Sequence, residues 1–109
     1  MRLFNANSRI AIDIVYLLKS RGHLRNSDMA ETIGKSPSFV EQTAAKLRKA
    51  GILIAFRGPG GGYALRSEPV SLLEVLEACG QYDANRVLML HESDKLEEQV
   101  NDYFNKVVL

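Results

Sequence analysis

The sequence predicts a mainly helical α+β domain in which three helices, a small β-hairpin and two further helices follow one another. Five segments carry apolar residues at helical spacing, each bounded by a capping residue or a glycine. Between the third and fourth of them, two short β-prone runs flank a glycine-rich stretch. The chain has 109 residues, of which 46% are hydrophobic and 25% charged. These values fit one compact domain and exclude disordered, collagen-like and disulfide-stapled classes.

The first two helices are predicted from their ends and their apolar stripes. Ser8 can cap a first helix that Gly22 ends, and Ser27 can cap a short second helix that Gly34 ends. His23 is expected in the loop between them. The apolar positions are Ile10, Ile14, Leu17 and Leu18 in the first helix, and Met29, Ala30 and Ile33 in the second.

The third helix has the strongest start in the chain, because Ser36 at the N-cap precedes Pro37 at the first helical position. It is predicted to run to about Ala50 and to stop at Gly51. Its inward residues are Val40, Ala44 and Leu47. Its other side carries short polar residues near the start and cations near the end: Ser38, Glu41, Gln42, Ala45, Lys46, Arg48 and Lys49.

After Gly51 the pattern changes to that of two short strands, 52–56 and 63–66, joined by the glycine-rich loop Arg57–Gly62. The loop does not match a phosphate-binding P-loop, which needs a lysine and a following helix. A dinucleotide-binding motif fails on spacing and on the strand that follows. Three helices followed by such a hairpin have the order of a winged helix-turn-helix. Glycines would let the backbone of this wing approach a duplex, with Arg57 in the minor groove.

The second part of the chain contains two predicted helices. Ser71 and Glu74 form a capping box for a helix that ends at Gly80 and has Leu72, Val75, Leu76 and Cys79 on one stripe. Residues 81–85 are predicted as a loop, and a last helix starts at about Asp94. Its apolar positions are Leu96, Val100, Tyr103, Phe104 and Val107. We therefore expect residues 1–69 to form the winged-helix part, and residues 70–109 to add a connecting helix and a long last helix in one compact unit.

The net charge of +1 hides an asymmetry between these two parts. Residues 1–66 hold eleven basic and four acidic side chains, a net charge of +7, whereas residues 67–109 hold three basic and nine acidic ones, a net charge of −6. This split indicates that the first part faces a polyanion, although two solvated faces with a chance bias would look the same. On double-stranded DNA, Ser38, Glu41 and Gln42 would reach base edges, and Lys46, Arg48 and Lys49 would neutralise phosphates. The alternative is a solvated helix face.

Residues 1 to about 80 resemble the IscR/NsrR/CymR-like family of bacterial winged-helix transcription regulators. The residues that carry the resemblance are the wing 57–63 (RGPGGGY), the segments 38–42 and 47–51 around the third helix, and the helix start 70–75. The resemblance implies a homodimer on a partly palindromic promoter site. It also implies base contacts from Ser38, Glu41 and Gln42, and minor-groove entry by Arg57. The DNA-binding wing would comprise Arg57, Gly58, Gly60, Gly61, Gly62 and Tyr63. The last helix is similar to the family's dimerisation helix, which would bury Leu96, Val100, Phe104 and Val107.

One departure from the family pattern concerns the cofactor. Many members hold a [2Fe–2S] cluster on three closely spaced cysteines, but Val87 stands where the first of these is expected. Cys79 and His91 alone do not supply the four ligands that such a cluster usually takes. We therefore expect no cluster, no metal and no other cofactor, and the sequence identifies no small-molecule ligand. Cys79 is then either an inert buried thiol or a thiol sensor.

Together these observations predict a cytoplasmic, cluster-less transcription regulator that acts as a repressor. No secretory signal is recognised, and nothing approaches the ~20 apolar residues of a membrane span. An enzyme is not expected, because no nucleophile motif is present and the single cysteine has no histidine near it in sequence. Two alternatives stay open: a winged-helix module that binds an acidic protein, and a relative that forms mixed dimers with another regulator.

Overall fold

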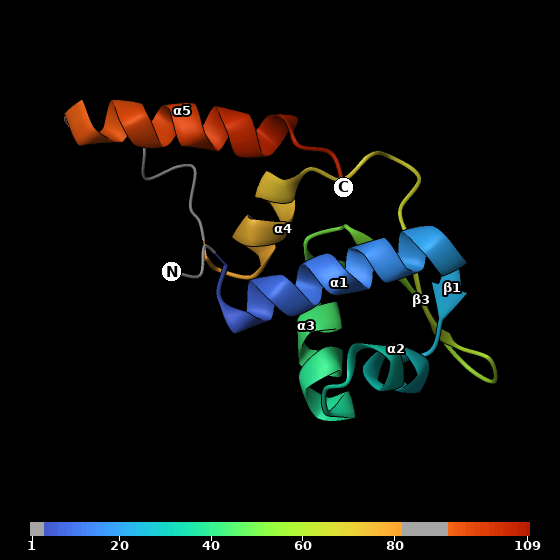
Figure 1. Ribbon diagram of the computed structural model, residues 1–109. Coiled ribbons are helices and arrows are strands. Elements are labelled where there is room, and N and C mark those ends of the chain that lie inside the picture. The colour runs from blue at the N-terminus through green and yellow to red at the C-terminus, as the bar shows by residue number, and fades with distance from the viewer. Residues whose placement is uncertain (1–3, 82–91) are drawn as a thin grey trace.

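A computed structural model describes residues 4–81 and 92–109 of the chain, with the backbone alone for 92–97. The elements in order are α1 (Ala6–Arg21), β1 (His23–Leu24), α2 (Asn26–Ile33), α3 (Pro37–Lys49), β2 (Leu53–Phe56), β3 (Gly62–Leu65), α4 (Leu72–Ala78) and α5 (Glu92–Lys106) (Figure 1). The prediction of a mainly helical protein with a small wing is confirmed. Most of the predicted loop 81–85, together with Val87 and His91, lies outside the described residues.

The predicted starts of α3 and α4 are both confirmed by their capping hydrogen bonds. The Ser36 hydroxyl accepts from the amide N–H of Phe39 at 3.2 Å. At α4, the Ser71 hydroxyl accepts from the Glu74 amide at 3.2 Å, and Glu74 Oε2 accepts from the Ser71 amide at 2.9 Å. Each capping box or cap satisfies amide groups that the helix itself leaves unpaired.

The predicted N-caps of α1 and α2 are wrong, by three residues and by two residues. Asn5 caps α1, and its Oδ1 accepts from the amide of Ser8, which is a buried residue of the first turn. In α2 the N-cap is Arg25, which makes no side-chain capping bond, so Ser27 lies inside the helix. Asn and Ser cap helices about equally well, so the local sequence did not distinguish Asn5 from Ser8.

The sheet has three strands in the order β1-β3-β2, whereas the sequence predicted a two-stranded hairpin. His23, expected in a loop, lies in β1 and pairs with Ala64, and Leu24 pairs with Tyr63. On the other side of β3, the register pairs Ala55 with Tyr63. A two-residue strand has no periodicity to detect, and it forms here because β3 offers it an edge to pair with.

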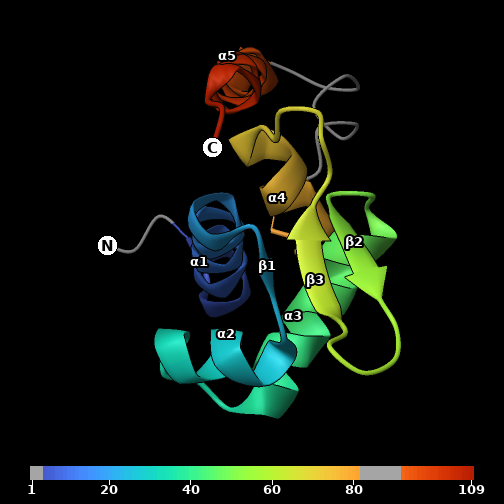
Figure 2. The same cartoon turned by 90° about the vertical axis from the view of Figure 1, so that its right-hand side faces the viewer.

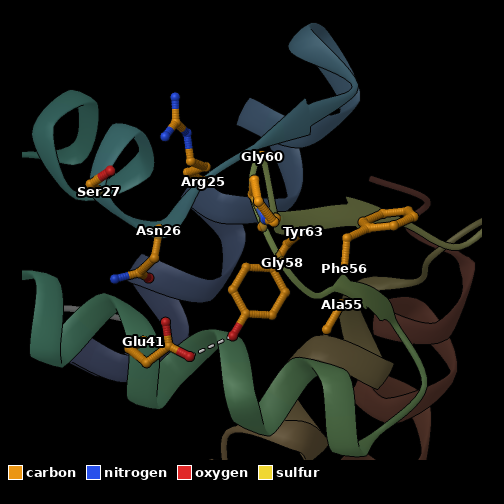
Figure 3. A pocket seen from close by; sticks show the side chains of 12 residues that line it. Arg25, Asn26, Ser27, Glu41, Ala55, Phe56, Gly58, Gly60 and Tyr63 are labelled. Carbon is orange, nitrogen blue, oxygen red and sulfur yellow. Dashed lines mark hydrogen bonds between the residues drawn. The ribbon is translucent and has the colours of Figure 1, made fainter.

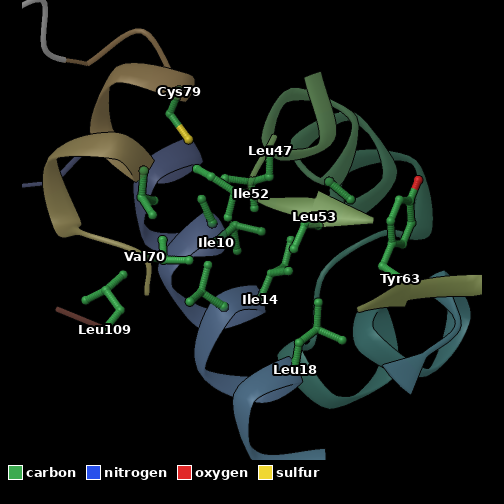
Figure 4. Packing of buried hydrophobic residues seen from close by; sticks show 14 of the residues in the cluster. Ile10, Ile14, Leu18, Leu47, Ile52, Leu53, Tyr63, Val70, Cys79 and Leu109 are labelled. Atoms are coloured by element: carbon green, nitrogen blue, oxygen red, sulfur yellow. The ribbon is translucent and has the colours of Figure 1, made fainter. Parts of the chain in front are cut away.

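The hydrophobic core lies around α1, which packs against α2, α3, α4 and β3. Ile14 and Val15 of α1 are fully buried, and so are Leu47 of α3 and Ile52 before β2. Figure 4 shows Ile14, Leu47 and Ile52 among the side chains packed between α1, α3 and the sheet. The buried stripes predicted for α1, α3 and α4 therefore form one continuous cluster. The inner face of α3 packs against this cluster, and its outer face is exposed to solvent.

The C-terminal segment folds back onto the start of α4. The amide of Leu109 donates to the Val70 carbonyl at 2.9 Å, and the amide of Leu72 donates to the Val107 carbonyl at 2.8 Å. α5 lies at the end of the molecule opposite α2 and the wing (Figures 1 and 2). It has 15 residues, against 16 in α1, so the long last helix that the sequence predicts is not found. Within the described residues, none of the helices combines the length and the apolar character needed to cross a lipid bilayer.

Candidate nucleic-acid interface

The outer side of α3 presents the polar residues predicted to read DNA. Ser38, Glu41 and Gln42 are exposed in its first half, and Arg48 and Lys49 are exposed near its end. Their spacings of three, four and seven residues place them on one face, because a helix turns once in about 3.6 residues. The opposite face, with Val40, Ala44 and Leu47, is buried. The core thus fixes which side of α3 faces outward.

The wing between β2 and β3 is a tight, glycine-dependent turn. The amide of Gly61 donates to the Gly58 carbonyl at 2.9 Å, and Arg57 is exposed at the start of the turn. Gly62 has φ of +138°, and a Cβ built on it would run into the carbonyl oxygen of Leu24. A Cβ on Gly61 would lie 2.6 Å from the Phe56 carbonyl oxygen. These two positions therefore require glycine for the close approach of neighbouring strands.

A hydrogen bond joins the wing to α3. The Tyr63 hydroxyl of β3 donates to Oε1 of Glu41 at 2.6 Å (Figure 3). Tyr63, predicted to contact DNA, has only 8% of its surface exposed. Burial, and after it the hydrogen bond to Glu41 and the negative charge of Glu41, raises the pKa of Tyr63 to about 12, while the positive charge of Arg48 opposes the shift. The hydroxyl therefore stays protonated at neutral pH and can donate to Glu41.

A hollow of about 500 Å³ lies between the wing, the start of α2 and α3. Glu41 and Tyr63 line one side of it, and the wing glycines line another (Figure 3). The start of α2 supplies Arg25, Asn26 and Ser27, which the sequence analysis did not select. Arg25 and Ser27 are exposed. The sequence could have pointed to Arg25 and Ser27 by their position at the start of a helix, because helix N-termini attract phosphate groups.

The cations of α3 do not all face the wing. Lys46 and Lys49 line a separate hollow of about 390 Å³ together with Ala78, Cys79 and Gly80 at the end of α4. Cys79 is only 7% exposed, and its Sγ lies 3.8 Å from the Asn7 carbonyl oxygen. Burial raises the pKa of the Cys79 thiol, against the opposing charge of Lys46. A buried, neutral thiol is a poor nucleophile.

The residues predicted to form a dimer interface have different surroundings. Val100 is 45% exposed on α5, but Phe104 is 9% exposed and belongs to the core of its own chain. Val107 is half-buried against the same core. The side chain of Leu96 lies outside the described part of the chain. Tyr103 at 65% and Val108 at 58% add to the exposed apolar surface here.

Comparison with known proteins places this geometry in context. The HTH-type transcriptional regulator IscR of Aliivibrio salmonicida is 46% identical over 55 residues, which are 50% of this chain and 33% of that protein. The regulator of the same name from Escherichia coli O1:K1 / APEC is 39% identical over 75 residues, or 66% of this chain and 46% of that protein. The chain thus spans less than half the length of these relatives. They are transcriptional regulators and not enzymes, in agreement with the sequence prediction.

Solved structures agree over nearly the whole chain. CymR, the global cysteine regulator of B. subtilis, has a TM-score of 0.74 at 22% identity and covers 99% of this chain and 93% of its own. T. potens IscR has a TM-score of 0.75 at 20% identity and covers 98% and 82%. At these identities the two structures show the fold. The Rrf2 family, described as "Iron-dependent Transcriptional regulator", matches residues 4–108. The chain belongs to the Rrf2 family.

Proposed function

We propose that the protein is a sequence-specific DNA-binding transcriptional regulator that reads a duplex with α3 and the wing. The observation that carries this proposal is that Glu41, on the exposed polar face of α3, and the wing residues 58–63 line one hollow. Arg57 is exposed at the start of the same wing. Both belong to the part of the chain with a net charge of +7. A polar helix beside a cationic, glycine-rich turn suits a major groove and its neighbouring minor groove.

Each side chain of this surface has a proposed role. Ser38, Glu41 and Gln42 reach base edges from the N-terminal half of α3. The cations Lys46, Arg48 and Lys49 contact phosphates near its end. Arg57 enters the minor groove, where the glycines 58 and 60–62 allow the backbone to approach. Arg25 and Ser27 at the start of α2 hold a further phosphate, because unpaired amide groups at a helix N-terminus attract anions.

We propose that the protein acts as a homodimer on a partly palindromic promoter site and represses transcription by occupying it. Residues 1–69 form the DNA-binding part, and residues 70–109 form the part that pairs. Support comes from the apolar side chains that α5 and its end leave exposed, namely Val100, Tyr103 and Val108. Phe104 contributes by holding α5 on its own core. A two-fold dimer would present two α3 helices to successive turns of DNA, hence the palindrome.

The residues present do not fit an iron–sulfur cluster, although the family description mentions iron. The sequence has one cysteine, and it is buried at the end of α4 with its pKa raised. Among the described residues, no group of three His, Cys, Asp or Glu side chains could hold a metal. We therefore propose a cluster-less regulator and derive no step through a cluster.

The proposal is tested by selecting duplexes from a random DNA pool, followed by fluorescence titration of the selected and a scrambled duplex at two salt concentrations. Specific sites normally bind about 10³-fold or more tighter than non-specific DNA. Arg57→Ala should weaken binding, and Gln42→Ala should relax the preference at one base pair. Arg21→Ala, an exposed cation at the end of α1, serves as the matched control. Equal affinity for both duplexes would favour a winged-helix module whose partner is an acidic protein.

The oligomer is tested separately by sedimentation equilibrium. Tyr103→Asp should shift a dimer toward monomer, because it places a charge in the exposed apolar surface of α5. If Tyr103→Asp leaves the dimer unchanged, the exposed surface of α5 does not form the dimer interface. A chain that is monomeric alone but pairs with a longer family member would favour the mixed-dimer modulator.

A further inference from the structure

The Tyr63 hydroxyl is a fixed point at the edge of the proposed DNA-reading surface. Tyr63 lies on β3, the central strand, and pairs with Leu24 on one side and with Ala55 on the other. Tyr63 is 8% exposed, so packing allows its side chain little freedom. From this position the hydroxyl donates to Glu41 at 2.6 Å.

Glu41 alone has no such constraint. It is exposed in the first half of α3, and an exposed glutamate samples several rotamers, so ordering it costs conformational entropy. The hydrogen bond selects one of these arrangements before any partner binds. It engages Oε1, and Glu41 lines the hollow between α3 and the wing.

We propose that Tyr63 is a positioning residue for base recognition: its hydroxyl holds the Glu41 carboxylate in the place from which that carboxylate selects one base pair. This inference rests on the proposed function. Tyr63 acts through Glu41, because Tyr63 is only 8% exposed and its hydroxyl donates to the Glu41 carboxylate. The wing and α3 are thereby aligned by the same contact.

The chemistry of a carboxylate decides what it selects. An ionised carboxylate only accepts hydrogen bonds, and the N4 amino group of cytosine is its usual donor partner in the major groove. Bases that present an acceptor at the same place are repelled. A carboxylate held in one position makes this distinction at one base pair, whereas a mobile one can turn away from an unfavourable base and discriminates less.

The experiment compares the base preferences of the full chain, three variants and one control variant by selection from random duplexes, followed by titration of single-base-pair substitutions. Tyr63→Phe removes only the hydroxyl and keeps the buried ring. Glu41→Ala removes the carboxylate at an exposed helical position, and the double variant completes the cycle. Tyr16→Phe is the matched control, since Tyr16 is 52% exposed on α1 and lines a different hollow. Thermal unfolding checks that each variant folds.

We expect Glu41→Ala to lose a preference of roughly tenfold for cytosine at one base pair. Tyr63→Phe should reduce the same preference several-fold at the same pair and leave the others unchanged, and it should have no further effect once Glu41 is alanine. A Tyr63→Phe profile equal to that of the unmodified chain overturns the inference, as does a uniform loss of affinity with unchanged base preference. If the unmodified chain selects no sequence at all, both the proposed function and this inference fail. If it selects a sequence but Tyr63→Phe changes nothing, only this inference fails.

Discussion

Replacing Gly62 by alanine tests the geometry of the wing most directly. Gly62 begins β3 with φ of +138°, a conformation that L side chains rarely adopt. The new Cβ would also collide with the Leu24 carbonyl oxygen and lie 2.9 Å from the Arg25 Cα. Because both contacts are backbone, rotation of a side chain does not relieve them. The substitution therefore forces β1 away from β3.

Two contributions add up in this variant. A strained backbone conformation costs about 1–3 kcal/mol. Overpacking against fixed atoms costs a further 1–3 kcal/mol or so. We expect a loss of roughly 2–6 kcal/mol of unfolding free energy, a large share of the usual total of about 5–15 kcal/mol. The midpoint temperature should fall by about 10 °C or more.

Gly60→Ala is the matched control for Gly62→Ala. Gly60 also has a positive φ, +77°, but a Cβ there meets nothing within 4 Å. It should cost only about 1–2 kcal/mol, the price of a left-handed conformation for alanine. Urea unfolding followed by circular dichroism measures both variants. Equal losses in unfolding free energy would refute the argument that the approach of β1 to β3 requires Gly62.

Three further predictions concern the helices. Ser36→Ala should lower the unfolding free energy by about 1 kcal/mol in urea titration, because the amide of Phe39 loses its capping hydrogen bond. An unchanged unfolding free energy would mean that this cap does not stabilise α3. Partial burial raises the pKa of the Glu74 carboxyl, but hydrogen bonds from Arg66 at 2.6 Å and from Ser71 outweigh it and lower the pKa. A lowered pKa stabilises the fold above the usual pKa of a glutamate and ceases to do so as the pH falls through the shifted value. Glu74→Gln should therefore flatten the loss of unfolding free energy as the pH falls below the usual pKa of a glutamate, and an unchanged acid profile would contradict this. Cys79 should react with iodoacetamide at least about tenfold more slowly in the folded protein than in denaturant, because the thiol is buried and its pKa is raised. Cys79→Ser should leave the DNA affinity unchanged, both with and without peroxide. If the substitution abolishes an effect of peroxide on DNA affinity, Cys79 is a thiol sensor.

Local signals in the sequence determined the helices, the wing and the polar face of α3. Ser36 with Pro37, and Ser71 with Glu74, satisfy helix ends through residues at most three positions apart. Gly58 and Gly60 have positive φ in the tight turn of the wing, which is an equally local feature. Such features depend on neighbours along the chain, so the sequence alone is sufficient to predict them.

Only the tertiary structure decided which distant residues meet. β1 forms because β3 offers an edge with which it can pair, and a strand of two residues is too short to be predicted from periodicity. Phe104 has the spacing of an interface residue, yet the fold encloses it in its own core. Tyr63 and Glu41 lie 22 residues apart, and their hydrogen bond depends on how α3 packs against the sheet. Periodicity says which side of an element is apolar, but the packing of the elements decides what that side touches.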